Sequence, residues 1–354
     1  MKILEISSLQ ENTPPHGYGG VERFVHYLSS QLSEMGDDVT VVLKEGSEGG
    51  KYRKVEINSE NIINKVDKFL KNNAVDIIHL NYKQIELIEY LKKVSIPIVL
   101  TLHNNIRQES SWLSIINDAP KHFNFSVISN SLKNRVIEKM KLCGYKIDGI
   151  EIEIIDYASP HVVVVDTKKT KDYYLYLGVI ARYKGVLDVV KYFSTTNSNL
   201  LVVGPCNNDD EQEYFNQILE VINKSQNIKY YGATKDEQEK MSLVSDAKAI
   251  VMATGYDPLE SDCHEAFGLV MLEANQIGVP VIGYAKGNIK DYILDGVNGY
   301  KFNNIEEINN IISSIESNDL SEKCIEYSNR FDIGVITKKY REYFDKILSR
   351  NSLI

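Results

Sequence analysis

The chain has 354 residues, of which 43% are hydrophobic and 25% are charged, so it is too apolar to be disordered and long enough for two globular domains. Its formal net charge of -9, without a basic stripe, excludes a nucleic-acid-binding protein, because phosphate contacts supply most of that affinity. The four cysteines lie far apart, which argues against a zinc site and a disulfide framework and fits a reducing compartment.

The first expected elements are an apolar strand at residues 2–7, a helix at 21–35 and a second strand at 38–43, which together form a βαβ unit. No apolar signal region precedes the first strand, and no run of eighteen or more apolar residues occurs. We therefore expect a cytoplasmic protein that is neither secreted nor membrane-spanning. Gly19 and Gly20 precede the helix; they let backbone N–H groups approach an anion, but they are equally typical of an ordinary turn.

The rest of the first half alternates between strands expected at 76–80, 96–102, 125–129 and 150–155 and helices expected at 59–72, 83–93 and 131–142. This alternation predicts a parallel, doubly wound sheet, which binds ligands at the carboxyl ends of its strands. His103 follows one of these strands, where it is either a ligand-facing residue or an ordinary loop residue. The basic segment 131–146 presents either a solvated helix face or a surface for an anionic membrane.

A polar segment at 166–172, rich in Lys and Thr, is expected to link two domains. A second series follows, with strands at 173–178, 200–204, 229–232 and 247–253 and helices at 211–224, 236–244, 305–316 and 319–329. A long amphipathic helix is then expected at 331–348, with a stripe formed by Val335, Tyr340, Tyr343, Phe344 and Leu348. The expected domains are 1–164 and 165–330, followed by a helical segment at 331–354.

Two carboxylates, Glu265 and Glu273, flank the start of an expected helix at Gly268, one on the loop before it and one within it. A helix start offers unpaired N–H groups and a positive dipole end, and Gly268 has no side chain to keep a phosphate away. The helix carboxylate can accept hydrogen bonds from ribose hydroxyls, and the loop carboxylate can reach a sugar beyond the phosphates. The layout fits a nucleotide sugar, although two such glutamates are also common on a solvated helix surface.

The stretch beginning at Glu265 resembles the donor site of the retaining glycosyltransferases of family 4, which carry an E-x7-E signature. The resemblance implies the GT-B fold, an α/β architecture with two Rossmann-like, doubly wound parallel-sheet domains facing a cleft. It implies that Glu265 has a catalytic role on the donor sugar and that Glu273 binds the ribose. Glu273 and Lys184 are both expected to face a wet cleft. The turn Phe267, Gly268 and Leu269 is expected to contact the nucleotide sugar.

Three further motifs extend the resemblance over nearly the whole chain. Lys184 matches the cation that clamps the departing diphosphate, whose growing charge requires permanent positive charge. The usual arginine position holds Val179, so that role passes to Arg182. The loop after Gly232 corresponds to the one that holds the base, and the C-terminal helix resembles one that crosses back to the first domain.

In the N-terminal half, the sequence around Gly19 and Gly20 resembles the glycine loop that touches the donor diphosphate. His103 resembles a histidine that faces the donor sugar, which implies a catalytic role for it. Asp209 and Asp210 adjoin each other at a helix start, where we expect them to cap the helix rather than to hold Mg²⁺. We expect no metal and no cofactor, because fixed cations and helix N-termini neutralise the leaving group.

The resemblance therefore implies a retaining, hexosyltransferase-type enzyme that moves a sugar from a nucleoside-diphosphate sugar to an acceptor hydroxyl. Glycans, lipid-linked saccharides and small molecules are all candidate acceptors, and the oligomeric state stays open. A lipid-linked acceptor would place this cytoplasmic protein at the inner face of the membrane, through 131–146. Two alternatives stay open: a sugar-nucleotide epimerase, and a non-catalytic GT-B partner, which Val179 at the arginine position favours.

Overall fold

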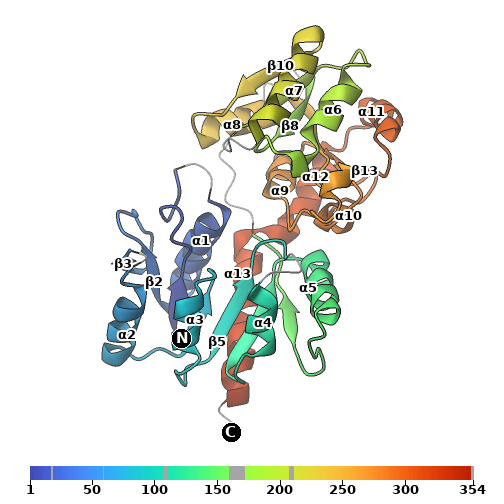
Figure 1. Ribbon diagram of the computed structural model, residues 1–354. Helices are drawn as coiled ribbons and strands as arrows, with labels where there is room; N and C mark the ends of the chain where they lie inside the picture. Colours follow the sequence, from blue (N-terminus) through green and yellow to red (C-terminus); the bar gives the residue numbers. More distant parts are fainter. Residues whose placement is uncertain (17–18, 59, 107–110, 159–171, 207–210, 352–354) are drawn as a thin grey trace. The chain divides into compact units, whose positions relative to one another are not determined.

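The computed structural model describes residues 1–354 apart from 17–18, 59, 107–110, 159–171, 207–210 and 352–354. The chain divides into two compact units, the first made of Met1–Pro160 with Phe331–Ile354 and the second of His161–Arg330 (Figure 1). Each unit is built on one parallel sheet with helices around it, which confirms the expected pair of Rossmann-like domains. The expected boundary at residues 164 and 165 lies outside the described residues.

The sheet of the first unit has seven parallel strands in the order β3-β2-β1-β4-β5-β6-β7. These strands are β1 (Lys2–Ile6), β2 (Asp38–Lys44), β3 (Arg53–Ile57), β4 (Ile77–Leu80), β5 (Ile98–Leu102), β6 (Phe123–Val127) and β7 (Ile152–Ile154). The helices are α1 (Gly20–Glu34), α2 (Ile62–Asn72), α3 (Ile85–Leu91), α4 (Ser111–Asn117), α5 (Asn130–Leu142) and α13 (Ile333–Asn351). The strand order reverses direction between β1 and β4, so the carboxyl ends of these strands form the switch point of the sheet.

Two elements of the first unit are absent from the sequence analysis. β3 is a charged, half-exposed edge strand whose sequence, Arg53 to Ile57, has no apolar run. Its register is set by β2, where Val42 pairs with Val55. α4 is only seven residues long. Tertiary pairing and packing, which local patterns do not contain, stabilise both elements.

The sheet of the second unit has six parallel strands in the order β10-β9-β8-β11-β12-β13. These strands are β8 (Tyr173–Leu177), β9 (Leu200–Val203), β10 (Ile228–Gly232), β11 (Ala247–Met252), β12 (Val281–Tyr284) and β13 (Gly299–Phe302). The helices are α6 (Val186–Phe193), α7 (Gln212–Lys224), α8 (Glu237–Ser245), α9 (Leu269–Gln276), α10 (Asn288–Tyr292), α11 (Ile308–Ser317) and α12 (Ser321–Ser328). Here the switch point lies between β8 and β11.

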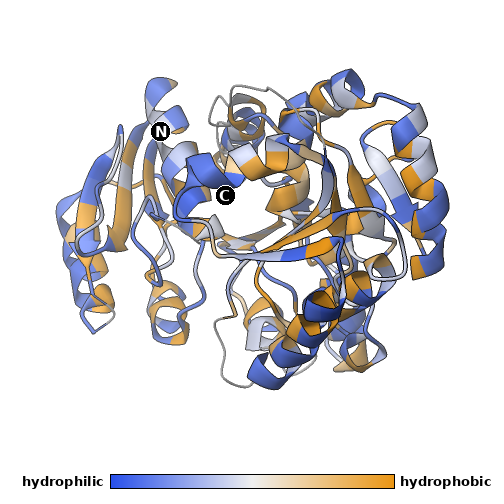
Figure 2. Ribbon diagram, turned by 90° about the horizontal axis from the view of Figure 1, so that it is seen from above, coloured by the Kyte–Doolittle hydropathy of each residue, from blue (hydrophilic) through white to orange (hydrophobic). Residues whose placement is uncertain are grey.

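The strands of both units are mostly hydrophobic along their length, whereas the helices show hydrophilic stretches (Figure 2). This difference follows from burial, because helices cover both faces of a parallel sheet and remove its side chains from water. In the second unit the core contains large side chains from strands and helices, including Tyr174, Phe193, Tyr214 and Phe302. Their burial fixes the strand ends that carry the candidate site.

The last helix, α13, belongs to the first unit and packs against α1. Ile336, Tyr340 and Phe344, spaced four residues apart, are fully buried, and Arg341 Nε lies 2.9 Å from Asp37 Oδ2. The expected stripe is wrong at Val335, which is 40% exposed, because Ile336 takes the inward position. Among the described residues, we find no helix both long and apolar enough to cross a bilayer.

Candidate active site

The candidate site of the second unit lies at the carboxyl ends of β8 and β11, the switch point where open sheets bind ligands. Lys184 ends the 3-10 turn η1 (Arg182–Lys184), which follows β8. Glu265 lies on the loop between β11 and α9. Two segments that are 81 residues apart in the chain are thus brought together by the sheet.

A half-buried ion pair joins these segments. Lys184 Nζ lies 2.8 Å from Glu265 Oε2, and Thr254 Oγ1 donates a hydrogen bond to the same oxygen over 3.0 Å. Burial lowers the pKa of Lys184, but the nearby Glu265 carboxylate outweighs burial, so the pKa is raised overall. Lys184 therefore keeps its charge, and an arriving anion can compete with Glu265 for it.

The start of α9 is shaped by Gly268, which has a φ of 89°. A Cβ atom at this position would lie 2.5 Å from Met271 Cε and 3.1 Å from Glu265 Cγ, so a larger residue is strained and crowded. Asn288 holds the preceding loop: its side chain donates to the Phe267 carbonyl over 2.7 Å, and its N–H donates to the Glu265 carbonyl over 3.0 Å. The first turn, beginning at Leu269, thus keeps its N–H groups free of a side-chain cap.

Glu273 lies on α9, as expected, but its side chain is only 7% exposed, so the prediction of a wet position is wrong. Lys240 of α8 explains the burial: its Nζ lies 3.0 Å from Glu273 Oε2 and 2.6 Å from Glu237 Oε1. Burial lowers the pKa of Lys240, but the two carboxylates outweigh it and raise the pKa overall. Glu273 is therefore held by a cation from the preceding helix, α8.

Arg182 lies two residues before Lys184, at the start of η1, but has different partners. Its Nη1 lies 3.3 Å from Asp257 Oδ2, its guanidinium stacks 4.9 Å from the centre of the Tyr214 ring, and its N–H donates to Glu211. The two cations of η1 thus have separate carboxylate partners. Arg182 must leave Asp257, or share it, in order to bind a phosphate.

Gly232 ends β10, and its carbonyl accepts a hydrogen bond of 2.8 Å from Gly204 N. Gly204 follows β9 with a φ of 145°, and a Cβ atom there would lie 1.8 Å from the Gly178 carbonyl oxygen. The carboxyl ends of β8, β9 and β10 are therefore packed backbone against backbone. A row of glycines leaves main-chain groups accessible along the edge where a ligand is expected.

In the first unit, α1 begins at Gly20, one residue earlier than expected, and Gly19 precedes it with a φ of 145°. The phenolic O–H of Tyr157 donates to the Gly20 carbonyl. Glu22 is 3% exposed, and its Oε2 would lie 3.2 Å from a Cβ atom on Gly19. A buried carboxylate beside the glycine pair opposes binding of a phosphate there and favours hydroxyl groups.

His103 follows β5 and is 7% exposed. The rings of Phe24 and Tyr157 lie 5.5 and 5.6 Å from its own, centre to centre. Its Nε2 lies 2.9 Å from Asn81 Oδ1. Burial, followed by the field of His79, lowers the pKa of His103 to about 3, so the imidazole is neutral near pH 7.

The structure adds four residues that the sequence analysis does not name: Lys240, Thr254, Glu5 and Asn81. Glu5 and Asn81 lie at the switch point of the first sheet, on β1 and directly after β4. Glu5 interrupts the apolar run of a buried strand, and a charge in such a place is unusual without a partner. That signal is readable in the sequence, whereas the pairing of Lys240 with Glu273 depends on helix packing.

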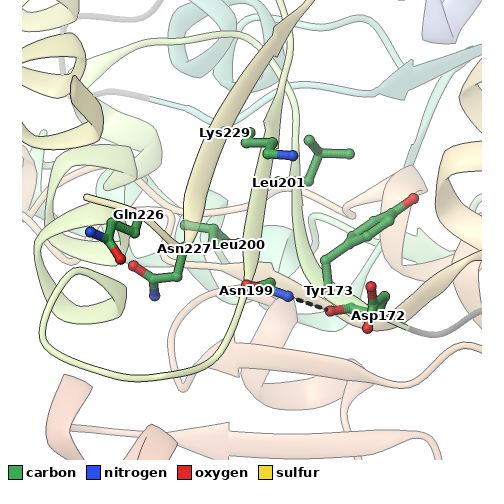
Figure 3. Close-up of a pocket in the computed structure, with 8 residues that line it drawn as sticks. All are labelled: Asp172, Tyr173, Asn199, Leu200, Leu201, Gln226, Asn227 and Lys229. Carbon is green, nitrogen blue, oxygen red and sulfur yellow. Dashed lines mark hydrogen bonds between the residues drawn. The ribbon is translucent and has the colours of Figure 1, made fainter. Parts of the chain in front are cut away.

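The sheet of the second unit also has a cavity at the amino ends of its strands. A cavity of about 330 Å³ lies at the amino ends of β8, β9 and β10, lined by polar residues such as Asp172, Asn199 and Lys229. In Figure 3, Asn199 donates to the Asp172 carbonyl, over 3.2 Å. Parallel sheets bind ligands at their carboxyl ends, so this hollow is not the candidate site. Asp209 and Asp210 lie outside the described residues, and elsewhere in the described chain no three His, Cys, Asp or Glu side chains converge as a metal site.

Two protein-family models match the chain in succession. Residues 18–179 match a model described as Glycosyltransferase Family 4, and residues 162–331 match one described as Glycosyl transferases group 1. A protein of Klebsiella pneumoniae, described as an uncharacterized 41.2 kDa protein in the cps region, is 24% identical over 313 residues, which cover 78% of this chain and 80% of that protein. Both halves of the chain thus match glycosyltransferase sequences.

Solved structures have the same fold. Sucrose-phosphate synthase of Thermosynechococcus elongatus superposes with a TM-score of 0.74 at 16% identity, over 99% of this chain and 100% of that chain. The Anabaena protein HepE, in complex with UDP and glucose, superposes with a TM-score of 0.69 at 16% identity, over 98% of this chain and 99% of that chain. These likenesses establish the two-domain fold, and the family models add the class of activity.

Proposed function

We propose that this chain, a glycosyltransferase with the GT-B fold, transfers a sugar from a nucleoside-diphosphate sugar to an acceptor hydroxyl with retained anomeric configuration, as family 4 enzymes do. The observation that carries the proposal is the Lys184–Glu265 pair at the switch point, 2.8 Å long and next to the glycine start of α9. A fixed cation and free N–H groups there suit a diphosphate. A carboxylate on the same loop suits the sugar attached to it.

Each residue of this site then has a distinct task. Lys184 and the first turn of α9 stabilise the negative charge that grows on the diphosphate as the bond to the sugar breaks. Glu273, held by Lys240, accepts hydrogen bonds from the ribose hydroxyls. Glu265, released from Lys184 by the diphosphate, turns to hydroxyls of the donor sugar. In the first unit, His103 accepts a hydrogen bond from a sugar hydroxyl.

Retention follows in this proposal from a front-face reaction, in which the acceptor hydroxyl attacks on the side that the diphosphate leaves. The departing phosphate oxygen takes the proton of the acceptor, so no side chain is required as a base. A covalent intermediate on a carboxylate is the less favoured route, because Glu265 is already paired with Lys184 and Thr254. The cations and helix dipoles replace a metal ion.

The substrate classes are proposed from relatives. UDP-glucose is the first donor to test, since the Anabaena structure holds UDP and glucose. A saccharide acceptor, free or lipid-linked, fits the cps-region relative. Contact of 131–146 with a membrane has weaker support, because Arg135 and Lys139 of α5 are buried and do not contribute to an exposed basic face.

Calorimetry with UDP and a donor panel tests the proposal. We expect Lys184→Ala and Glu273→Ala to weaken nucleotide binding by about 10- to 100-fold, the cost of a charge-assisted hydrogen bond. Lys224→Ala is the matched control, since Lys224 lies at the end of α7, is 73% exposed and pairs within its own helix, with Glu220 over 2.6 Å. Unchanged affinity in both site variants would place the nucleotide elsewhere.

A non-catalytic, nucleotide-binding GT-B protein is the second candidate, favoured by the engagement of Arg182 with Asp257. Release of nucleoside diphosphate from the donor separates the two candidates. Binding without release, across a panel of donors and saccharide acceptors, would support the non-catalytic role. Release that depends on the acceptor would support transfer, and acceptor-independent conversion of the donor sugar would indicate an epimerase.

A further inference from the structure

We propose that Glu5 and Asn81 are positioning residues that hold His103 in one tautomer, with the proton on Nε2 and a bare, hydrogen-bond-accepting Nδ1. These residues form a buried chain of hydrogen bonds in the first unit, which runs from Glu5 on β1 through Asn81, directly after β4, to His103. That its ligand is a sugar hydroxyl rests on the proposed function, whereas the tautomer does not.

The directions of the hydrogen bonds follow from the carboxylate at the end of the chain. Glu5 is fully buried, and its two carboxylate oxygens lie within hydrogen-bond distance of Asn81 Nδ2 and His79 Nδ1. Asn81 Nδ2 lies 3.0 Å from Glu5 Oε2, so the NH₂ of Asn81 points at Glu5 and its oxygen points away. That oxygen lies 2.9 Å from His103 Nε2. An oxygen acceptor requires a proton on Nε2, and a neutral imidazole then has none on Nδ1.

A second donor secures the carboxylate in this arrangement. His79 Nδ1 lies 2.9 Å from Glu5 Oε2 and 3.0 Å from Oε1, and His79 Nε2 lies 2.7 Å from Thr101 Oγ1. Thr101 in turn bonds with Ser126 Oγ over 2.6 Å. A buried charge is costly unless it is paired, and these partners supply what Glu5 needs. The carboxylate is thus held in place and sets the orientation of the Asn81 amide.

His103 Nδ1 is the free end of the chain. It is buried and has no hydrogen-bond partner within the part of the protein that the structure describes. A structural network that served the fold alone would satisfy its last atom, since a buried, unpaired acceptor costs stability. The orphaned nitrogen points instead to a ligand that supplies the missing proton donor.

The tautomer decides the chemistry that His103 can recognise. A bare Nδ1 accepts a hydrogen bond from a hydroxyl or an N–H group and repels the oxygens of a phosphate, which offer only lone pairs. The lowered pKa of His103, caused first by burial, keeps the imidazole from gaining a second proton near pH 7. His103 therefore selects the sugar rather than the diphosphate of a sugar nucleotide.

Nitrogen-15 labelling of the histidines tests the tautomer directly. Long-range ¹H–¹⁵N spectra distinguish protonated from bare ring nitrogens, and a His103→Asn spectrum assigns the signal among the seven histidines. We expect wild-type His103 to show a bare Nδ1 and a protonated Nε2. A protonated Nδ1, a mixture of tautomers or an imidazolium at pH 7 would overturn the proposal.

Glu5→Gln tests the positioning role. A glutamine amide can donate as well as accept, so the side-chain amide of Asn81 can flip and His103 can populate both tautomers. We expect a mixed signal at His103 and about a tenfold lower kcat/KM for the sugar nucleotide, with UDP affinity unchanged. Thr40→Val, an isosteric change at a buried hydroxyl of β2 that has no hydrogen-bond partner among the described residues, is the control and should keep the wild-type signal. Should Glu5→Gln fold poorly, Asn81→Leu breaks the same link with an apolar side chain of similar volume.

The outcomes separate the two proposals. A mixed signal with unchanged kcat/KM would make the chain purely structural and overturn the positioning role. An unmixed signal in both Glu5→Gln and Asn81→Leu would overturn the control of the tautomer. A fixed tautomer in a protein that binds no sugar nucleotide would refute the proposed function and leave the tautomer assignment intact.

Discussion

At the scale of single residues, Glu265 has the most informative contacts in the second unit. It shares one oxygen between Lys184, at 2.8 Å, and Thr254, at 3.0 Å. Glu265→Gln keeps the shape of the side chain but removes its charge. We expect kcat to fall on the order of 10²-fold, about 2.7 kcal/mol of barrier, because the carboxylate stabilises positive charge on the sugar in the transition state.

Affinity for UDP provides the internal control for Glu265→Gln. Lys184 loses a competing carboxylate, so we expect UDP binding to stay equal or to tighten. Steady-state kinetics and calorimetry on the same preparation measure both quantities. A wild-type kcat would show that Glu265 serves only to hold Lys184.

His103 links the site of the first unit to pH. Its pKa is lowered from 6.5 to about 3 in the folded state, mainly by burial, so below pH 6.5 the unfolded state binds more protons. The free energy of unfolding is therefore unaffected by His103 above pH 6.5. It decreases as the pH falls from 6.5 toward 3, because only the unfolded state takes up the proton. Between pH 6.5 and pH 5 we expect the free energy of unfolding to fall by about 2 kcal/mol more in wild type than in His103→Asn.

The single tryptophan makes this measurement specific to one unit. Trp112 lies on α4 of the first unit, so its fluorescence reports unfolding of the unit that contains His103. Urea titrations at the two pH values provide the comparison. If the free energy of unfolding changed equally with pH in wild type and His103→Asn, the pKa of His103 would not be lowered in the folded state, and the prediction would be wrong.

At the scale of elements, α13 combines a buried stripe with an exposed charged face. Phe344 is fully buried and lies 5.4 Å from the ring of His79, whereas Arg350 is 52% exposed and pairs with Glu151 over 2.8 Å. We expect Phe344→Ala to lower the stability of the first unit by about 3–5 kcal/mol, because it leaves a cavity in a packed core. Arg350→Ala, the matched control, should cost less than about 1 kcal/mol. Urea unfolding followed by Trp112 fluorescence measures both losses of stability. Equal losses in the two variants would contradict the distinction between the buried stripe and the exposed face of α13.

Strands and helices with a strong hydrophobic pattern could be predicted from the sequence. Elements that are stabilised mainly by pairing or packing with other elements could not. The apolar strands of both sheets and the helix that begins after Gly268 follow directly from composition and glycine placement. β3 escapes prediction because three of its five residues are charged and only Ile57 is buried. Val335, which was expected to face inward but is exposed, shows the same limit. Which residues of α13 are buried depends on how the helix packs against α1 and the sheet.

The candidate site shows this limit at individual residues. The placement of Glu265, Gly268 and Glu273 along the chain was predictable from one short segment. The cation that buries Glu273 was not, because Lys240 comes from another helix and resembles any lysine of a charged surface. Partners across elements become visible only when the packing is known.

At the scale of the whole molecule, the fold supplies its own positive charge where the reaction is proposed to need it. Lys184 keeps its ammonium charged because Glu265 raises its pKa. We therefore expect turnover to persist in excess EDTA, with kcat within about twofold of its value in Mg²⁺, since fixed cations and helix N-termini act on the diphosphate. Phosphate-release assays on chelated enzyme measure this. Loss of turnover that Mg²⁺ restores would contradict metal independence.

The first unit is interrupted in sequence by the second, because its last helix is contributed by Phe331–Ile354. During synthesis on a ribosome, β1 to β7 emerge long before α13 exists. At bacterial or eukaryotic rates of 5–20 residues per second, roughly ten to forty seconds separate them. Throughout that time the surface that later covers Tyr340 and Phe344 is open to water, and the second unit can fold first. The nascent chain thus exposes a hydrophobic face of the first unit until the final helix is synthesised.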